Sequence, residues 1–226
     1  MAALLLRLAA PLQAWGSSSK FNIRTTEREP TKSGVIGMIA AALGIKRNDD
    51  PEKLVPLSEL RFGVRVEREG KLLKDFHMVY TGSLSDKARR HTKSDSKNMH
   101  LTERYYLSDA VFLVALESDN KCLLNRIAEA LENPVFPLFL GRRSCPPTLP
   151  VVLGMRDDDL LTVLRNEESL TGKNNSSKRI IYEVYNGGSV VKDVPLSFSQ
   201  MHRQHGYRMK KEEMVLPGEH DPFEEL

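Results

Sequence analysis

The sequence predicts an α+β fold, because strand-like and helix-like segments alternate over roughly its first 140 residues. Three observations carry this prediction: an apolar run at residues 2–9, an almost wholly apolar helix pattern at 30–44, and an amphipathic helix pattern at 119–132. Strand-like stretches lie between the two helices and after the second one. The resulting order, βαββαβ, is typical of ferredoxin-like and RNA-recognition-motif domains, an arrangement that serves many functions.

The first unit consists of a strand and a loop. Residues 2–9 are too few, and too close to Pro11, for a stable helix, so we expect a mostly buried strand. Trp15 is the only tryptophan and stands at the start of a polar loop. Such a side chain can either pack in the core or offer a stacking surface to a ligand.

The helix at residues 30–44 has the clearest local signals. Thr31 and Ser33 supply hydroxyls for its first turn, and Gly44 is suited to end it. Its almost continuous apolar surface predicts burial against a sheet. The partial positive charge of a helix N-terminus, together with Lys32, suits an anion such as a phosphate. A well-capped core helix without a ligand is the structural alternative.

The remaining elements of the core follow from shorter patterns. Residues 61–68 and 72–79 alternate about a Glu-Gly turn, which predicts a hairpin, and residues 105–117 give the strongest strand pattern of the chain. After the helix at 119–132, residues 136–140 are expected to form the last strand. We therefore expect residues 1–150 to form one ferredoxin-like domain, for which the family resemblance given below implies RNA binding.

A polar, basic insert lies at about residues 80–104. Between positions 87 and 104 it holds six basic residues against two acidic ones, the basic ones being Lys87, Arg89, Arg90, Lys93, Lys97 and Arg104. Such a stretch is the expected footprint of a phosphate backbone, although a solvated loop has the same composition. We expect it to be mobile in the free protein and to become ordered on binding, which the family resemblance given below implies is to RNA and a neighbouring subunit.

Charge and composition limit the class of protein. Residues 1–150 hold 23 Lys and Arg against 17 Asp and Glu, whereas residues 151–226 hold 10 against 13. The second segment is expected to be a smaller, mainly β extension, with a hairpin about Asn186-Gly187 and an acidic tail at 217–226. Two unrelated cysteines and the absence of a signal or membrane-spanning pattern favour a reduced, cytoplasmic chain.

Few catalytic patterns are present. Thr31 stands where a phosphate-binding loop needs its second glycine, and His202 and His205 have no further metal ligand at a suitable spacing. Metal-free RNA cleavage stays open, since it needs only a base, a proton donor and a cation. The residue types that could supply these roles occur at His77, Tyr80, Lys87, His91 and Lys93.

Several stretches together resemble a known family. They include Gln13-Ala-Trp-Gly16, Pro30-Thr-Lys-Ser-Gly34, Asp75-Phe-His77, Arg104–Ala110 and Leu140-Gly-Arg-Arg-Ser-Cys-Pro146, all within residues 4 to about 154. The sequence is similar in these stretches to the CRISPR-associated protein 5 family of type I-E systems, within the repeat-associated mysterious protein superfamily. The first and last motifs together are highly specific, whereas the likeness past residue 155 is thin.

The resemblance implies a fold and a function. Such proteins have a ferredoxin-like core with a protruding β-hairpin thumb, which here falls on residues 80–104. They hold the 5′ handle of the CRISPR RNA (crRNA), cap the filament of backbone subunits of the effector complex Cascade, touch its large subunit and meet target DNA only through the complex. In type I-E systems another subunit cleaves the precursor RNA, whereas the type I-C relative cuts RNA itself. A purely structural filament cap is a third possibility.

The expected RNA-binding residues combine both lines of argument. A fixed RNA end is normally recognised as a single strand. No metal, cofactor or membrane contact is expected. The RNA-binding candidates are Trp15, Gly16, Arg24, Thr31, Lys32, Ser33, Gly34, His77, Arg89, Arg90, Lys93, Lys97, Arg104, Gly141, Arg142, Arg143 and Ser144.

Overall fold

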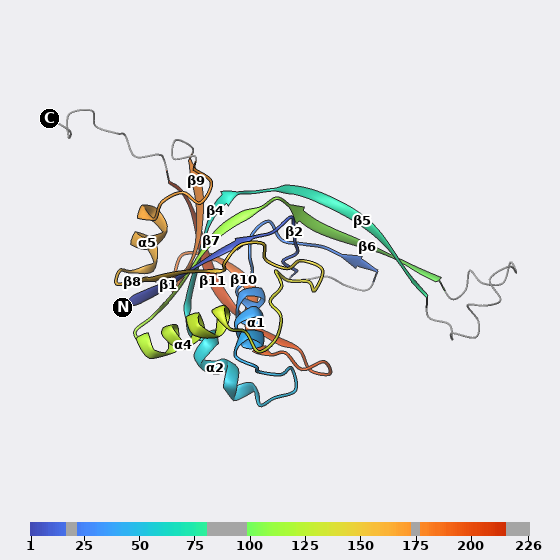
Figure 1. Ribbon diagram of the computed structural model, residues 1–226, viewed down its shortest axis with the longest axis horizontal. Coiled ribbons are helices and arrows are strands. Elements are labelled where there is room, and N and C mark those ends of the chain that lie inside the picture. Colours follow the sequence, from blue (N-terminus) through green and yellow to red (C-terminus); the bar gives the residue numbers. More distant parts are fainter. Residues whose placement is uncertain (17–21, 81–98, 173–176, 216–226) are drawn as a thin grey trace, which may run out of the picture.

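The computed structural model describes residues 1–16, 22–80, 99–172 and 177–215, and these form two sheets and a few helices (Figure 1). The large sheet has seven strands, and each pair of neighbouring strands in it runs antiparallel. In spatial order the strands are β10 (Ser189–Ser197), β11 (Gln204–Val215), β9 (Lys178–Val184), β4 (Arg61–Arg68), β7 (Val111–Ser118), β1 (Ala2–Ala9) and β8 (Val152–Arg156).

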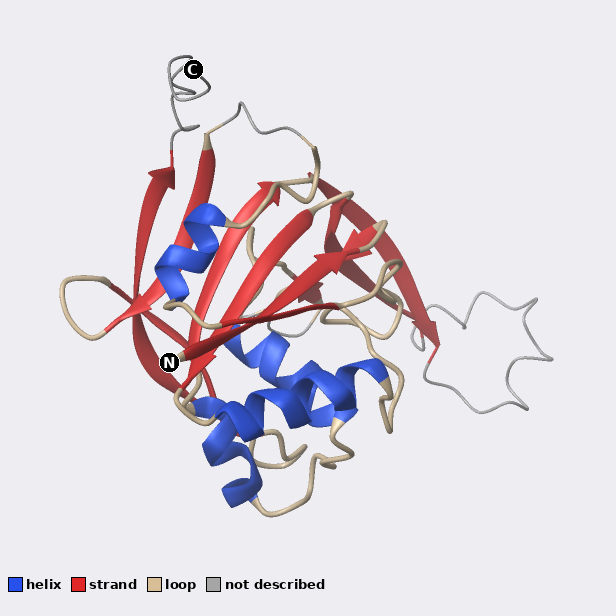
Figure 2. Ribbon diagram, turned by 60° about the vertical axis from the view of Figure 1, so that its left-hand side comes forward, coloured by secondary structure: helices blue, strands red, loops and turns tan. Residues whose placement is uncertain are grey.

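Helices cover both faces of the large sheet (Figures 1 and 2). One face packs against α1 (Lys32–Ala42) and α4 (Lys121–Glu132), with the short helices η1 (Pro51–Leu54) and α2 (Val55–Ser58) beside them. The other face carries α5 (Leu160–Asn166).

The central strands are apolar on both sides because both sides are covered. In β1, Leu4 and Leu6 belong to the core beneath α1 and α4, whereas Leu5 belongs to the core beneath α5. In β7, Phe112 and Leu113 divide between the two cores in the same way. A strand buried on both faces has no polar face, which explains the continuous apolar runs in the sequence.

A smaller sheet forms an arm that projects from the body (Figure 1). Its main strands, β5 (Lys71–Tyr80) and β6 (Met99–Ser108), pair over ten residues each. The short strands β2 (Leu12–Gln13) and β3 (Ile23–Arg24) pair with the inner part of β6. The basic insert is therefore carried by a β-hairpin. Its residues 81–98 lie outside the described part of the chain.

Two strand predictions are wrong at the junction of the sheets. The segment at 72–79 is a strand, but it pairs with β6 rather than with β4, so the predicted hairpin with 61–68 does not form. The single strand predicted over 105–117 is two strands in different sheets. The chain turns between them at Asp109, which adopts φ 58°. Because apolar patterns report burial and not partners, neither error was visible in the sequence.

Two further strand predictions are also wrong. Residues 136–140 are not a strand: the N–H groups of Val135 and Phe136 instead donate to the carbonyls of Ala42 and Ala41 at the end of α1. The strand that follows α4 in the chain is β8. The predicted hairpin about Asn186-Gly187 is absent too, because β9 and β10 each pair with β11, which lies between them.

The mixed α and β character and the helix signals are confirmed. Thr31 caps α1 by accepting from the N–H of Gly34 at 3.2 Å, and Gly44 follows the helix with φ 78°. Asn120 caps α4 in the same manner. Strands from before and after residue 150 share the large sheet, while the division into two units at that position stays a prediction.

Candidate nucleic-acid interface

Three motifs that are distant in sequence meet at one place. The ring of Trp15 lies against Gly34 at the start of α1, where a Cβ atom would come within 2.9 Å of the indole. On the other side, a Cβ atom on Gly141 would lie 1.7 Å from the carbonyl oxygen of Ala14. Gly141 also adopts φ 86°, a conformation that only glycine takes without strain. Both glycines are therefore required by close approach.

Trp15 is a packing residue. Its side chain is 1% exposed, and its indole N–H donates to Oε1 of Gln13 at 3.1 Å. The amide of Gln13 in turn donates to the carbonyls of Leu8 and Ala110. Of the two roles that the sequence left open, packing is the one that the structure shows, because a base cannot stack on a buried ring.

A cleft of about 330 Å³ opens where the three motifs meet. Eight of the predicted RNA-binding residues line it: Trp15, Gly16, Arg24, Thr31, Ser33, Gly34, Gly141 and Arg142. The start of β11 and the residue before it add two lining residues that sequence reasoning did not select, Arg203 and His205. The only signal for them in the sequence is the pair His202 and His205, for which a structural or surface role is expected because no further metal ligand stands at a suitable spacing. The cleft is referred to below as the motif cleft.

Arg142 acts as a clamp. Its guanidinium donates to the carbonyls of Tyr105 at 3.0 Å and Arg24 at 2.9 Å, and it stacks over the ring of Tyr106 at 4.7 Å. It therefore ties the loop after Gly141 to both β3 and β6. Hydrogen bonds to backbone carbonyls occupy the donors with which an arginine would bind phosphate.

Arg143 and Ser144 have a different position. Both are exposed, and no described residue forms an ion pair or side-chain hydrogen bond with Arg143. The loop that carries them is closed by hydrogen bonds between Leu140 and Cys145 and between Cys145 and Arg142. Burial raises the pKa of the Cys145 thiol, which makes this cysteine a packing residue and a poor nucleophile.

The arm presents one polar face that continues from the motif cleft. Arg24 and Asp75 are the cross-strand partners of Arg104, and such partners lie on the same face of a sheet. His77 lies two residues beyond Asp75, with Nδ1 4.0 Å from its carboxylate. The predicted residues Arg24, His77 and Arg104 are thus brought together on this face. Arg89, Arg90, Lys93 and Lys97 lie outside the described residues.

Lys32 does not face the motif cleft. Its side chain is 2% exposed and its ammonium donates to Glu183 at 2.8 Å. Burial lowers the pKa of Lys32, although Glu183 opposes this. The anion at the start of α1 is the carboxylate of Asp193, which accepts from the backbone N–H of Lys32 at 2.9 Å. The predicted phosphate contact by Lys32 would require these interactions to open, so we leave Lys32 out of the contact set proposed below.

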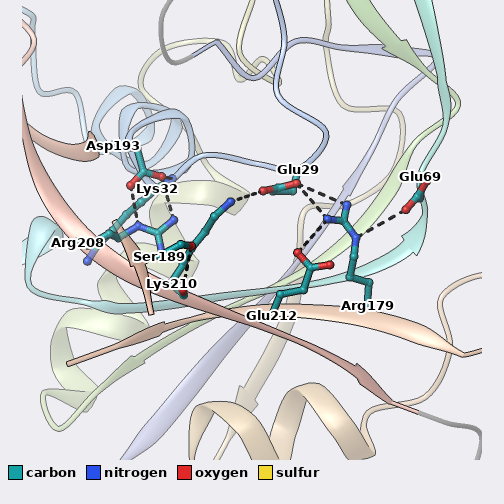
Figure 3. A network of polar contacts seen from close by, with 9 residues as sticks. All are labelled: Glu29, Lys32, Glu69, Arg179, Ser189, Asp193, Arg208, Lys210 and Glu212. Carbon is teal, nitrogen blue, oxygen red and sulfur yellow. Dashed lines mark hydrogen bonds and ion pairs between the residues drawn. The ribbon is translucent and has the colours of Figure 1, made fainter. Parts of the chain in front are cut away.

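Charged residues join the segment before α1 to the C-terminal strands (Figure 3). Arg208 binds Asp193 through two nitrogens, at 2.6 and 2.9 Å. Further along, Glu29 accepts from Lys210 at 2.7 Å and pairs with Arg179 at 3.5 Å. Arg179 on β9 and Arg208 and Lys210 on β11 share the face of the sheet that carries α1. The network fixes β10 and β11 beside the start of α1 and thereby places Arg203 and His205 at the motif cleft.

His205 is the most responsive titratable group of the motif cleft. Burial lowers its pKa, Arg203 and Lys192 lower it further, and Asp193 acts in the opposite direction. The imidazole is therefore neutral at neutral pH and can both donate and accept a hydrogen bond. Elsewhere in the described chain, no group of three or more His, Cys, Asp or Glu residues could hold a metal ion. None of its helices is long and apolar enough to cross a membrane.

Comparison with known proteins identifies the family to which this chain belongs. The family model described as CRISPR-associated protein (Cas5) matches residues 3–209. The chain therefore belongs to the Cas5 family of CRISPR-associated proteins, and the resemblance seen in its motifs is confirmed.

Three individual proteins are similar to this chain over most of its length. The chain is 36% identical to the CRISPR system Cascade subunit CasD of Escherichia coli (strain K12) over 178 residues, which cover 75% of this chain and 78% of that protein. Among solved structures, it is similar to a chain of a CRISPR RNA-guided surveillance complex, with a TM-score of 0.78 and 35% identity, covering 95% of this chain and 90% of that one. A crystal structure of a Cas protein gives a TM-score of 0.74 and 38% identity, with 95% of each chain covered.

Proposed function

We propose that this chain is the non-catalytic RNA-binding subunit of a type I-E CRISPR effector complex, and that it holds the 5′ handle of the crRNA in the motif cleft. The observation that carries the proposal is the convergence of three family motifs, at Trp15, Gly34 and Gly141, on one cleft with cationic side chains around it. The names of the relatives, a Cascade subunit and an RNA-guided surveillance complex, support it.

The proposed path of the RNA uses exposed cations. Arg203 lines the motif cleft, the exposed Arg143 directly follows the lining residues Gly141 and Arg142 in the chain, and the polar face of the arm continues from the cleft through the exposed Arg24 and the partly buried Arg104. A single strand suits such a path because its phosphates follow the cations while its bases turn outward or enter pockets. In this proposal β4, β7, β1 and β8 with α1 and α4 form the ferredoxin-like unit that supports the cleft.

The arm also supports a role in the filament. Its second face carries exposed apolar side chains around the Lys74–Glu103 ion pair, with Ile23, Leu72, Phe76, Met78 and Leu101 between 47% and 66% exposed. Cross-strand pairing places these residues on the face opposite Arg104. We propose that this face packs against a backbone subunit when the chain caps the filament, because large exposed apolar patches mark interaction sites. Contact with the large subunit is part of the same proposal.

The test of RNA binding compares matched arginines. In the double variant Arg143→Ala/Arg203→Ala, the affinity for the handle RNA should fall and the slope of log K against log salt should decrease by about 1.4, since each lost phosphate contact on a single strand removes roughly 0.7. Arg126→Ala, on the exposed side of α4, is the control and should leave the slope unchanged. Equal slopes in all three proteins would argue for a purely structural filament cap.

An endoribonuclease is the alternative that the pair of Asp75 and His77 keeps open, because a histidine beside a carboxylate can act as a general base. Both side chains lie on the exposed arm and away from the buried part of the motif cleft. We expect purified protein to give no discrete cleavage of its repeat RNA in EDTA. A single specific cut that disappears in His77→Ala would overturn this expectation.

A further inference from the structure

A cavity of about 350 Å³ lies on the face of the large sheet that carries α5, and it shares no lining residue with the motif cleft. Arg7 on β1 points to this face, because its cross-strand partner Leu113 belongs to the core beneath α5. Arg68 at the end of β4 and Leu170 after α5 line the cavity too. It is called the arginine cleft below.

Arg7 is the one charged residue of the otherwise apolar strand β1. Its Nη2 donates to the carbonyl of Pro150 at 3.2 Å, while its Nε is enclosed and has no partner among the described residues. Its Nη1 is neither enclosed nor bonded to a described residue, so a ligand can reach the guanidinium there. A partly buried cation without a carboxylate beside it is costly, and an anion in the cleft would offset that cost.

Arg68 is in a similar state. Its Nε donates to the backbone carbonyl of Asp109 at 2.5 Å, and its two Nη atoms have no partner among the described residues. Asp109 itself lines the cleft, and its carboxylate accepts from the hydroxyl of Ser108 at 3.2 Å. The cleft thus holds two guanidinium groups against one carboxylate. The other arginines around α5 each pair with a glutamate: Arg65 with Glu67, Arg156 with Glu167 and Arg165 with Glu213.

Apolar side chains stand beside these cations. Pro11 and Leu149 line the cleft and are exposed, Leu149 by 49%, and Leu170 is partly buried. A ligand gains here if it brings carboxylates to the arginines and apolar groups to their neighbours. That combination is typical of an acidic peptide with apolar residues between its carboxylates.

The chain itself contains such a peptide. Residues 216–226, which lie outside the described part, hold four acidic residues and no lysine or arginine. Apolar residues flank the carboxylates at Leu216, Phe223 and Leu226. The acidic residues are Glu219, Asp221, Glu224 and Glu225. The segment therefore complements the arginine cleft in charge and in apolar character.

The segment starts within reach of the cleft. Val215 packs against the core beneath α5 and pairs with Lys178, whose ammonium binds Glu67 at 2.9 Å, directly before Arg68. The last residue of β11 is thus two strands from Arg68, or about 10 Å, and Arg7 lies two strands further along the sheet, about 20 Å away in all. Eleven extended residues span at most about 36 Å, so the segment can reach both arginines.

We propose that the arginine cleft binds the chain's own acidic segment 216–226, whose carboxylates pair with Arg7 and Arg68. The inference goes beyond the proposed function and does not need RNA. The bound segment closes the arginine cleft to other anions. It therefore keeps a nucleic-acid backbone away from a cationic site on the face opposite the motif cleft.

The test measures cleavage of the acidic segment in the full chain by a glutamate-specific protease, with the products identified by mass spectrometry. A bound segment is protected, so Arg7→Gln and Arg68→Gln should each speed cleavage after Glu219 and Glu224, and the double variant by about fivefold, as expected for the loss of two modest ion pairs. Salt at 1 M should speed cleavage of the wild type in the same way. Arg126→Gln, which changes an exposed arginine on α4, is the matched control and should leave the rate unchanged.

A charge reversal provides a second readout. The variant Glu219→Lys/Asp221→Lys/Glu224→Lys/Glu225→Lys should lower Tm at low salt by a few degrees. Combined with Arg68→Glu, it should recover most of the Tm that the two changes lose separately. Combined with Arg126→Glu, the two effects should simply add. Because Arg68 is exposed, its variants decide the question even if those of Arg7 do not fold.

Three results would overturn the proposal. The first is an equal cleavage rate in the wild type and both arginine variants. The second is a wild-type rate that falls as the protein concentration rises, since the segment would then bind a second copy. The third is unchanged cleavage together with a smaller salt slope of RNA binding in Arg7→Gln/Arg68→Gln, which would assign the cleft to RNA. No RNA is present in the cleavage assay, so failure of the proposed function would not change its result.

Discussion

Adjacent arginines in one motif should behave in opposite ways when each is replaced by alanine. Arg142→Ala removes two short hydrogen bonds to backbone carbonyls and a stack on Tyr106. Hydrogen bonds from a charged group contribute about 1.5–3 kcal/mol each when buried, so for this half-buried side chain we take about 1 kcal/mol each. The stack adds roughly 0.5–1 kcal/mol. The expected loss of stability is therefore about 2–3 kcal/mol.

Thermal unfolding turns this loss into a measurable shift. For a chain of this length, 1 kcal/mol lowers Tm by about 2–4 °C, so Arg142→Ala should lower it by roughly 5–10 °C. Arg143→Ala removes an exposed side chain without a described partner, and its effect on stability should stay within about 0.5 kcal/mol. In RNA binding the order is reversed, because Arg143→Ala should reduce the salt slope by about 0.7.

A lysine at position 142 provides the control. Arg142→Lys keeps the charge but loses the planar fork that reaches both carbonyls, so it should be nearly as destabilised as the alanine variant. The reasoning is refuted if Arg142→Ala keeps its Tm and loses salt slope while Arg142→Lys restores it. Arg142 would then bind phosphate and would not be a clamp.

Three other perturbations test the remaining steps. Gly141→Ala places a Cβ against the carbonyl of Ala14 at φ 86° and should cost about 3 kcal/mol or more, whereas the control Gly187→Ala, with φ 74° and no atom nearby, should cost only about 1–2 kcal/mol in urea unfolding. The pKa of His205 is lowered in the folded state, so the stability that its neutral form provides is complete above about pH 6.5 and is lost as the pH falls through the lowered pKa. Tm measured at several pH values should therefore fall with pH over this range in the wild type, and this fall should be smaller in His205→Gln. Replacing residues 81–98 with a short Gly-Ser turn should leave Tm nearly unchanged, since the segment is polar, while co-purification with the other subunits fails; an unfolded variant would place the insert in the core.

The sequence could predict those parts of the fold that depend on neighbouring residues. The cap at Thr31 and the glycine at 44 are local signals, and α1 begins and ends beside them. Strand pairing is different, because a residue's burial does not specify its partner. The turn at Asp109 carries β6 and β7 into separate sheets, yet Leu107 shortly before it and Ala110 directly after it are both apolar and buried.

The candidate site could likewise be predicted only in part, because motifs are local whereas contacts between them are not. The motif residues were found in the sequence, but their meeting depends on contacts such as that of Trp15 with Gly34. The network of Asp193 and Arg208 was not found, since charged residues at alternate positions of a strand ordinarily indicate a solvent face. Here that face is covered by α1 and its leading segment, and the charges are satisfied by one another.

Within the family motifs of this chain, the residues that build the cleft differ from those that are proposed to contact RNA. Gly34 and Gly141 are required because an indole ring and a backbone carbonyl approach them closely, and Arg142 is occupied by carbonyls. These residues therefore build the cleft, and their conservative replacement should change stability. In the proposed function, RNA is contacted by exposed neighbours such as Arg143 and by Arg203, which lies outside the motifs.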